Sequence, residues 1–166
     1  MLNVERWALK LFAVTRNREI ERKFLPKSTP TDLAKFPHRH IEQGYLVATP
    51  DGRQVRLRRT QDSCTLTFKT ADGAVREERE IEITAEQFAA LWPATAGRRL
   101  TKERYEIPWN GLTIEVDVYR GVNQGIVVAE VEFADQTQCE QFRSPDWFGE
   151  EVTDNPHYSN VVLARE

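Results

Sequence analysis

The sequence contains few of the residues that mark secreted, membrane-bound or zinc-binding proteins. Its two cysteines, Cys64 and Cys139, show neither Cys-x-x-Cys nor Cys/His spacing, which argues against a disulfide framework and a zinc motif. No apolar run approaches the roughly 18 to 20 residues that a membrane-spanning helix needs. We therefore expect a protein without a membrane anchor in a reducing compartment, with the cytoplasm as its location.

Positive charge is not in excess either. The chain has 23 Lys and Arg against 26 Asp and Glu, which gives a net charge of −3, and its pI is near 5.7. Proteins that bind nucleic acid generally carry a basic footprint. We expect no nucleic-acid partner, and any basic site must be local.

The length of 166 residues fits one domain with a single core. The first 18 residues contain apolar side chains, but Glu5, Arg6 and Lys10 interrupt them and no small-residue cleavage site follows, so they fit a secretory signal poorly. We assign residues 1–18 to an N-terminal extension and residues 19–166 to a single domain. The sequence leaves a monomer and a homodimer equally open.

Most of the chain alternates like β-strands between turn residues. The predicted strands are 18–24, 43–49, 54–60, 64–70, 74–84, 97–107, 112–119 and 126–133. Between the first two strands, residues 25–40 are predicted to be a loop with at most one short helix. Thr84 and Gln87 form a capping box for a helix over 85–92, a second helix follows over 135–142, and the tail from 147 on is a loop and helix. This order predicts an antiparallel sheet with a few peripheral helices.

Nearly every predicted strand has one charged face and one apolar face, because side chains at i and i+2 share a face. The charged face consists of Glu19, Glu21, Lys23, Arg56, Arg58, Lys69, Arg76, Glu78, Glu80, Glu82, Lys102, Arg104, Glu115, Asp117, Glu130 and Glu132. A half-solvated sheet is the simplest explanation for any one such strand.

The set of charges favours a different explanation. Acids recur in pairs, such as Glu19/Glu21 and Glu130/Glu132, and bases recur in pairs, such as Arg56/Arg58. Like charges so close repel each other unless an oppositely charged group lies between them. Paired carboxylates suit a hard divalent cation, and paired bases suit phosphate oxygens. If the sheet closes with this face inward, the expected ligand is a metal-bound polyphosphate.

An ordered series of motifs extends this interpretation. It consists of ExExK at 19–23, QGYL at 43–46, RxR at 56–58, LTFK at 66–69, ExExE at 78–82, LWPATAGRRLTKERY at 91–105, EVDVY at 115–119, AEVEF at 129–133 and WFGEEVTDNPHYSN at 147–160. The series resembles the CYTH domains, the triphosphate tunnel metalloenzymes, and is most similar to the short bacterial members that act on inorganic tripolyphosphate. The resemblance covers nearly everything from Glu19 onward.

The resemblance implies an α+β fold built on a closed eight-stranded antiparallel β-barrel with a charged interior and peripheral helices. It also implies metal-dependent hydrolysis of a triphosphate, with Mg²⁺ or Mn²⁺ as cofactor. The residues implied to bind phosphate are Lys23, Arg56, Arg58, Lys69, Lys102 and Arg104. Those implied to bind metal are Glu19, Glu21, Glu130 and Glu132, with Asp117 as a further ligand. The set implied to be catalytic is Glu78, Glu80, Lys23, Tyr45 and Lys102, in which Glu78 and Glu80 hold a second metal or position water.

Three functions are compatible with such a tunnel. The first is hydrolysis of inorganic tripolyphosphate to pyrophosphate and phosphate. The second changes the substrate to thiamine triphosphate or a nucleoside triphosphate, or cyclises ATP as class IV adenylate cyclases do. The third is a polyphosphate-binding module without catalysis. The sequence shows no clear platform for an organic ring, and its acid pairs exceed what a binder needs, which favours the first.

Overall fold

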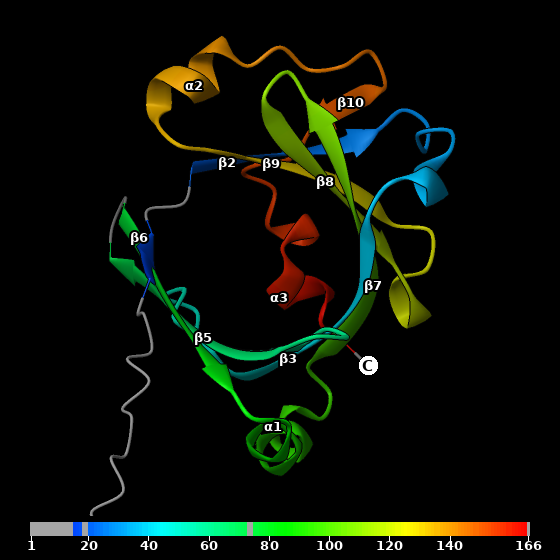
Figure 1. The fold of residues 1–166 in the computed structure, drawn as a ribbon. Helices are drawn as coiled ribbons and strands as arrows, with labels where there is room; N and C mark the ends of the chain where they lie inside the picture. Colours follow the sequence, from blue (N-terminus) through cyan, green and yellow to red (C-terminus); the bar gives the residue numbers. More distant parts are fainter. Residues whose placement is uncertain (1–14, 18–19, 73–74, 166) are drawn as a thin grey trace, which may run out of the picture.

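The computed structural model describes residues 15–17, 20–72 and 75–165. Within them, ten strands form one antiparallel sheet (Figure 1). The strands are β1 (Thr15–Asn17), β2 (Ile20–Pro26), β3 (His38–Ala48), β4 (Gln54–Arg59), β5 (Cys64–Asp72), β6 (Val75–Ile83), β7 (Arg99–Trp109), β8 (Leu112–Tyr119), β9 (Val127–Phe133) and β10 (Phe148–Glu151). Eight of the ten, β2 to β9, have six residues or more, which agrees with the expected eight-stranded antiparallel fold.

The helices of the described chain are few and short. They are α1 (Ala85–Leu91), α2 (Gln136–Gln141), α3 (Asn160–Leu163) and four 3₁₀ turns, η1 (Leu33–Lys35), η2 (Trp92–Thr95), η3 (Gly121–Asn123) and η4 (Pro156–Tyr158). The capping box of α1 forms as predicted, because Thr84 Oγ1 accepts from the Gln87 amide at 3.2 Å and Gln87 Oε1 accepts from the Thr84 amide at 2.8 Å. Among the described residues, no helix has the length and apolar character that crossing a membrane requires.

The sheet curls back on itself. Its order is β1-β6-β5-β4-β3-β7-β8-β9-β2-β10, so β1 is the first strand and β2 the last but one, although only two residues separate them in sequence. Two residues span roughly 10 Å at most, so β1, paired with β6, must lie close to β2, paired with β9. The strands therefore surround a tunnel, and α3 lies at its centre in the view along the axis (Figure 1).

The two faces of the strands separate as predicted. The register places residues of the charged face next to each other from strand to strand, such as Lys23 opposite Glu130 and Arg104 opposite Asp117. The outward side chains of β2, β8 and β9 form an aromatic and aliphatic core with α2 and β10. That core contains Phe24, Ile107, Ile114, Val116, Ala129, Val131, Phe133, Phe142 and Phe148. Burying such side chains contributes roughly 1.5 to 3 kcal/mol each.

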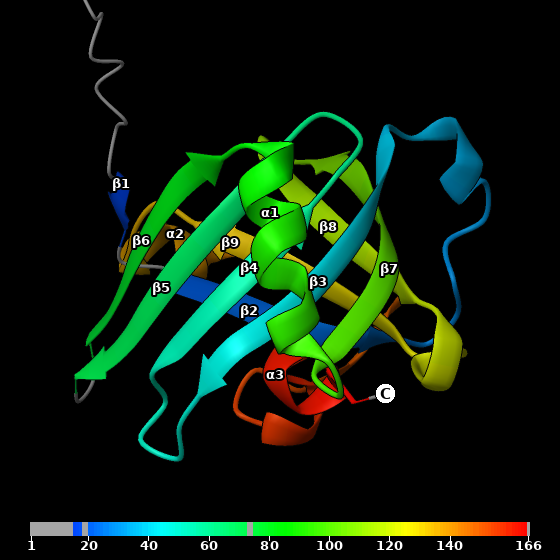
Figure 2. The same cartoon turned by 90° about the horizontal axis from the view of Figure 1, so that it is seen from below.

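On the side of the barrel formed by β3 to β6, the apolar exterior is only partly covered. Helix α1 lies across the outer face of β3 to β5 (Figure 2) and buries Phe88. Val47, Phe68 and Ile81 nevertheless remain 42%, 36% and 38% exposed. This part of the apolar exterior stays partly exposed because α1 has seven residues and is too short to cover every strand.

Three segments form strands that the sequence did not predict, residues 38–42, 148–151 and 15–17. Strand β3 begins at His38 rather than near residue 43, because the first half of the 11-residue β7 pairs with residues 38–44. Strand β10, predicted as part of a loop, pairs with β2 at Phe148 and Glu151. Strand β1 lies within the proposed N-terminal extension, whose boundary at residue 18 stays a prediction. All three segments lack the clear alternation of the longer strands.

Candidate active site in the tunnel

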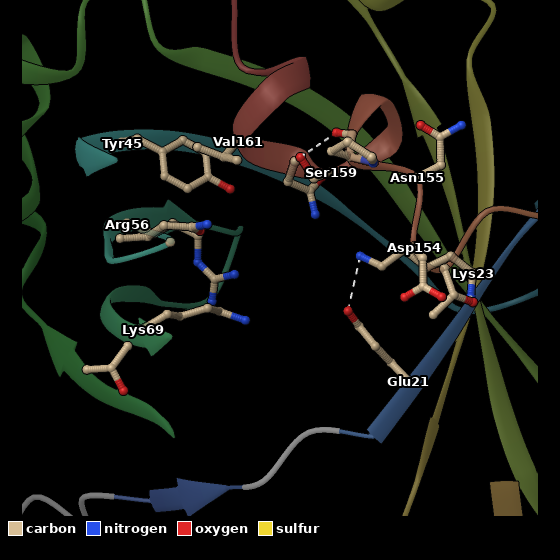
Figure 3. Close-up of a pocket in the computed structure, with 15 residues that line it drawn as sticks. Glu21, Lys23, Tyr45, Arg56, Lys69, Asp154, Asn155, Ser159 and Val161 are labelled. Atoms are coloured by element: carbon tan, nitrogen blue, oxygen red, sulfur yellow. Dashed lines mark hydrogen bonds and ion pairs between the residues drawn. The ribbon is translucent and has the colours of Figure 1, made fainter. Parts of the chain in front are cut away.

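One opening of the tunnel leads into a cavity of about 330 Å³ that is lined by several of the predicted residues (Figure 3). Strands β2, β4 and β5 contribute charged side chains and β3 contributes Tyr45, while the segment before α3, which includes Asp154, forms the opposite wall. The lining residues are Glu21, Lys23, Tyr45, Gly52, Gln54, Arg56, Lys69, Thr70, Thr153, Asp154, Asn155, Pro156, Ser159, Asn160 and Val161. Cavities of this size are typical of small-ligand sites.

Lys23 lies between two of the predicted metal ligands. Its ammonium group is 3.0 Å from Glu130 Oε1 and 3.2 Å from Glu21 Oε1. Burial alone would lower the pKa of Lys23, but the two carboxylates outweigh burial and raise the pKa above its ordinary value. Lys23 therefore carries a full positive charge toward the cavity.

Arg56 is held by neighbours from the next two strands. Its Nη2 donates to Thr67 Oγ1 at 2.9 Å and lies 3.3 Å from both Glu78 and Glu80. Thr67 in turn donates to Glu80 Oε2 at 2.7 Å. Lys69 completes this group with an ion pair of 2.5 Å to Glu78. The two predicted catalytic acids thus anchor two predicted phosphate ligands.

A second charged group lies deeper, between β7, β8 and β9. Arg104 donates to both carboxylate oxygens of Asp117 at 2.7 Å and to Glu130 at 3.0 Å, and it also pairs with Glu115. Lys102, fully buried, pairs with Asp117 as well. Burial first, and then the positive charge of Arg104, lower the pKa of Lys102 to about 8. An anion placed beside Lys102 would favour its protonated form.

Arg58 differs from the other cations because no carboxylate pairs with it among the described residues. Arg58 Nη2 donates to Gln43 Oε1 in a long hydrogen bond of 3.4 Å. Burial and the neighbouring charge of Arg56 lower the pKa of Arg58 to about 10, so it remains charged at neutral pH. Within the described chain, the Nε atoms of Arg56 and Arg58 are buried donors without an acceptor. Buried donors normally have acceptors, which suggests that a ligand supplies them.

The hydroxyl of Tyr45 meets the site from β3. Tyr45 is buried, and Gln43 Nε2 donates to its oxygen at 2.8 Å. Burial raises the pKa of Tyr45 above its ordinary value despite the nearby arginines, so Tyr45 is a neutral hydrogen-bond donor at neutral pH.

The acids proposed to bind metal lie side by side in the sheet. Glu21 is opposite Glu132, and Glu130 is opposite Glu115. Their oxygens are the ligands that a hard divalent cation prefers. Glu19 lies outside the described residues, and among those described no group of three or more acids, histidines or cysteines is arranged to hold a metal. The residue types therefore fit a divalent cation, while in this structure Lys23 and Arg104 balance part of the acidic charge.

Two predicted metal ligands occupy less favourable surroundings. Asp117 is fully buried and uses both oxygens for Arg104 and Lys102, which lower its pKa although burial acts in the opposite direction. Glu132 lies at the exposed rim. Their roles as metal ligands stay predictions.

Several residues of the site escaped the sequence-based prediction, among them Gln43, Thr67, Asn160 and, on the cavity wall, Asp154. Gln43 and Thr67 are fully buried and contact the predicted side chains directly. Asn160 at the start of α3 accepts from Lys102 Nζ at 3.2 Å and from the Tyr119 hydroxyl at 2.6 Å. A signal existed for the first two, since Gln43 and Thr67 share their strand faces with Tyr45 and Lys69 at a spacing of two.

Comparison with known proteins agrees with this geometry. The sequence model described as the CYTH domain matches residues 17–161. An inorganic triphosphatase from Nitrosomonas europaea is 42% identical over 149 residues, which cover 88% of this chain and 96% of that protein. An inorganic triphosphatase from Acetivibrio thermocellus is 35% identical over 152 residues, 89% of this chain and 94% of that protein.

Solved structures show the same relationship. A crystal structure of an inorganic triphosphatase has a TM-score of 0.68 and 38% identity, with 89% of this chain and 95% of that chain covered. An adenylate cyclase candidate from Bacillus halodurans has a TM-score of 0.55 at 14% identity and covers 87% of this chain and 99% of that one, which supports the fold alone.

Proposed function

Because this chain is a member of the CYTH domain family, we propose that it hydrolyses inorganic tripolyphosphate to pyrophosphate and phosphate inside the tunnel, with Mg²⁺ or Mn²⁺ as cofactor. Family membership implies a divalent metal, and the choice between these two ions belongs to the proposal. The inorganic triphosphatases of Nitrosomonas europaea and Acetivibrio thermocellus support the reaction, since both share most of their length with this chain.

The unpaired donors of Arg56 and Arg58 are the observation that carries the proposal. Both Nε atoms are buried without an acceptor in the described chain, and burial, with the charges of Arg56 and Arg104, lowers the pKa of Arg58 more than Glu80 and Asp117 raise it. Such a site stabilises an anion with several oxygens, because guanidinium groups donate in a fixed planar fork. Tripolyphosphate is such an anion, because it carries oxygens that can accept hydrogen bonds along its whole length.

The residues would have different roles in phosphoryl transfer, according to their position in the tunnel. Lys23, Arg56 and Lys69 line the cavity and would hold the phosphate chain there, with Arg58, Lys102 and Arg104 deeper on the same face. Positioning and charge stabilisation dominate this kind of reaction. Glu78 and Glu80 keep Arg56 oriented and would orient the attacking water.

The bound metal would supply charge neutralisation for the phosphate oxygens and activate water. We propose Glu19, Glu21, Glu130 and Glu132 as its ligands. Glu21 and Glu130 both contact Lys23 in this structure, so metal and lysine share the same acidic neighbours. A cation held there would balance those carboxylates and leave Lys23 to contact phosphate.

The lining of the cavity favours an inorganic substrate over thiamine triphosphate or a nucleotide. An organic ring needs an apolar or aromatic surface to rest on. Among the described residues that line the cavity, Tyr45 is the one aromatic side chain, and it is 2% exposed. A bare phosphate chain needs no such platform.

Two substitutions test the proposal. Arg56→Ala and Glu130→Gln each remove a group that contacts substrate or metal, and we expect each to lose about a hundredfold or more in kcat/KM with tripolyphosphate, the usual loss of one charge-stabilising group. Arg53→Ala and Glu150→Gln, both exposed, serve as matched controls. Phosphate release is measured with tripolyphosphate, thiamine triphosphate and ATP, each with Mg²⁺ and with Mn²⁺. Near wild-type turnover of either tunnel variant would contradict the proposal.

Three attributes accompany this proposal. The cytoplasm is the proposed location, consistent with the free thiols of Cys64 and Cys139. Residues 19–166 are proposed as a single tunnel domain after an extension over 1–18. A small-molecule triphosphate is the proposed partner, and a monomer and a homodimer are both compatible with it.

A further inference from the structure

Gln43 lies in the protein interior, where glutamine side chains are uncommon. It lies on β3, is fully buried, and points into the tunnel between Tyr45 and Arg58. Burying an amide is unfavourable unless its hydrogen bonds are replaced. Its two contacts therefore account for its presence there.

The partners of Gln43 determine which way its amide points. Arginine has only donors, so the atom that faces Arg58 Nη2 at 3.4 Å must be the carbonyl oxygen, Oε1. The other end, Nε2, then faces the Tyr45 oxygen at 2.8 Å as a donor. Tyr45 is thus the acceptor of this bond, and its own hydroxyl proton is left for another partner.

The backbone around Gln43 holds this arrangement in place. Gly44 lets η2 approach from outside the barrel, since a Cβ there would lie 2.7 Å from the Thr95 side chain and 2.9 Å from that of Trp92. The register of β3 with β4 shifts immediately after Tyr45. Gln43 and Tyr45 therefore point inward together at a fixed position, and the Tyr45 hydroxyl faces the cavity (Figure 3).

We infer that Gln43 is a positioning residue, which donates to the Tyr45 oxygen and so directs the Tyr45 proton toward the phosphate in the tunnel. The inference rests on the proposed function, and it adds a specific role for a residue that itself contacts no substrate. Arg58 fixes the direction of the amide, so one side chain couples a phosphate ligand to a hydroxyl donor.

Gln43→Met and Gln43→Glu separate this role from simple packing. Methionine fills nearly the same volume, so a packing role predicts almost unchanged activity. The positioning role predicts a loss of about tenfold in kcat with KM changed less than about threefold, because a misplaced group costs mainly transition-state stabilisation. Glutamate can only accept, so it would draw the Tyr45 proton away from the tunnel, and we expect a loss at least as large.

The double variant with Tyr45→Phe shows whether Gln43 acts through Tyr45. If it does, Gln43→Met should cost less than about twofold in the Tyr45→Phe background, because the two residues act as one unit. Gln61→Met, an exposed residue of the β4–β5 turn, is the matched control. Gln43→Met activity within twofold of wild type, or losses that multiply in the double variant, would overturn the inference.

A spectroscopic measurement distinguishes this inference from the proposed function. With fluorotyrosine incorporated, the ¹⁹F resonance that disappears in Tyr45→Phe reports on this hydroxyl. We expect it to shift in Gln43→Met and not in Gln61→Met, whether or not the protein turns over tripolyphosphate. If the wild type only binds tripolyphosphate, the proposed hydrolysis fails, and Gln43→Met should then weaken binding as much as Tyr45→Phe. An unmoved resonance would overturn the role of Gln43 in either case.

Discussion

Arg58 and Arg59 are neighbours on β4, but they lie on opposite faces of the strand and have different roles. Arg58 points into the tunnel, where among the described residues no carboxylate pairs with it. Arg59 points outward, pairs with Glu42 at 2.5 Å and lies 5.0 Å from the centre of the Phe88 ring. Arg58 is half-buried, and a cation withdrawn from water without a counter-ion lowers stability, so Arg58 is expected to serve ligand binding rather than folding.

Replacing each arginine with methionine tests this difference. Arg58→Met should lower kcat/KM for tripolyphosphate by about a hundredfold while the free energy of unfolding stays equal to wild type or rises, since an uncompensated charge is removed. Arg59→Met should leave kcat/KM unchanged and lower the free energy of unfolding by about 0.5 to 1 kcal/mol, the contribution of an exposed ion pair and a cation–π contact. Urea titrations and initial rates measure both. A marked loss of stability in Arg58→Met would contradict this assignment.

At the level of elements, the sequence predicts the long strands well and the contacts of the site less well. Alternation of charged and apolar side chains identifies β2 and β4 to β9 because each has one charged face toward the tunnel and one apolar outer face. The short edge strands β1 and β10 have three and four residues, too few for a period of two to stand out. Which base meets which acid depends on register, so the contact of Thr67 with Arg56 and Glu80 could not be predicted from one strand.

The hydrogen bonds of helix α3 to the barrel should contribute to the stability of the fold. Asn160 is the acceptor for two buried donors, Lys102 and Tyr119, on β7 and β8. Asn160→Ala leaves both without this acceptor, so we expect a loss of about 1 to 3 kcal/mol in the free energy of unfolding. Ser159→Ala, which removes the cap of this four-residue helix and a bond to the Pro156 carbonyl, should cost less. Equal stability of Asn160→Ala and wild type in urea would show that α3 is not held by these bonds.

The ion pair between Arg22 and Glu151 of edge strand β10 should make a pH-dependent contribution to the free energy of unfolding. Arg22 on β2 donates to Glu151 on β10 at 2.9 and 2.6 Å, and this bond lowers the pKa of Glu151 below its ordinary value of 4.5. A depressed carboxyl pKa stabilises the fold above the unfolded pKa and loses that effect as pH falls through the folded pKa.

Glu151→Gln is the matching variant. At pH 7 we expect it to be less stable than wild type by about 0.5 kcal/mol, a small value because the Glu151 side chain is 40% exposed. The difference should shrink to zero as the pH falls below 4.5. Glu150→Gln, one residue away on the same strand, should show no such difference. A gap between Glu151→Gln and wild type that persists at pH 3 would exclude this ion pair as the cause.

For the whole molecule, the tunnel combines like charges that a folded protein would ordinarily keep apart. Lys102 and Arg58 both have lowered pKa values because burial and neighbouring bases act on them together. The fold therefore carries an electrostatic cost that a multivalent anion can offset. Binding free energy adds directly to the free energy of unfolding when a ligand binds only the folded state.

Thermal unfolding in the presence of tripolyphosphate measures this coupling without turnover. With EDTA present to remove metal, a concentration of about 100 times Kd should add about 2.7 kcal/mol of stability, which corresponds to a rise in Tm of about 5 to 10 °C for a protein of this size. Sodium chloride at equal ionic strength controls for screening and should give almost no rise. Arg58→Met should lose most of the shift while keeping its own Tm. An equal rise in wild type and Arg58→Met would mean that tripolyphosphate binds outside the tunnel.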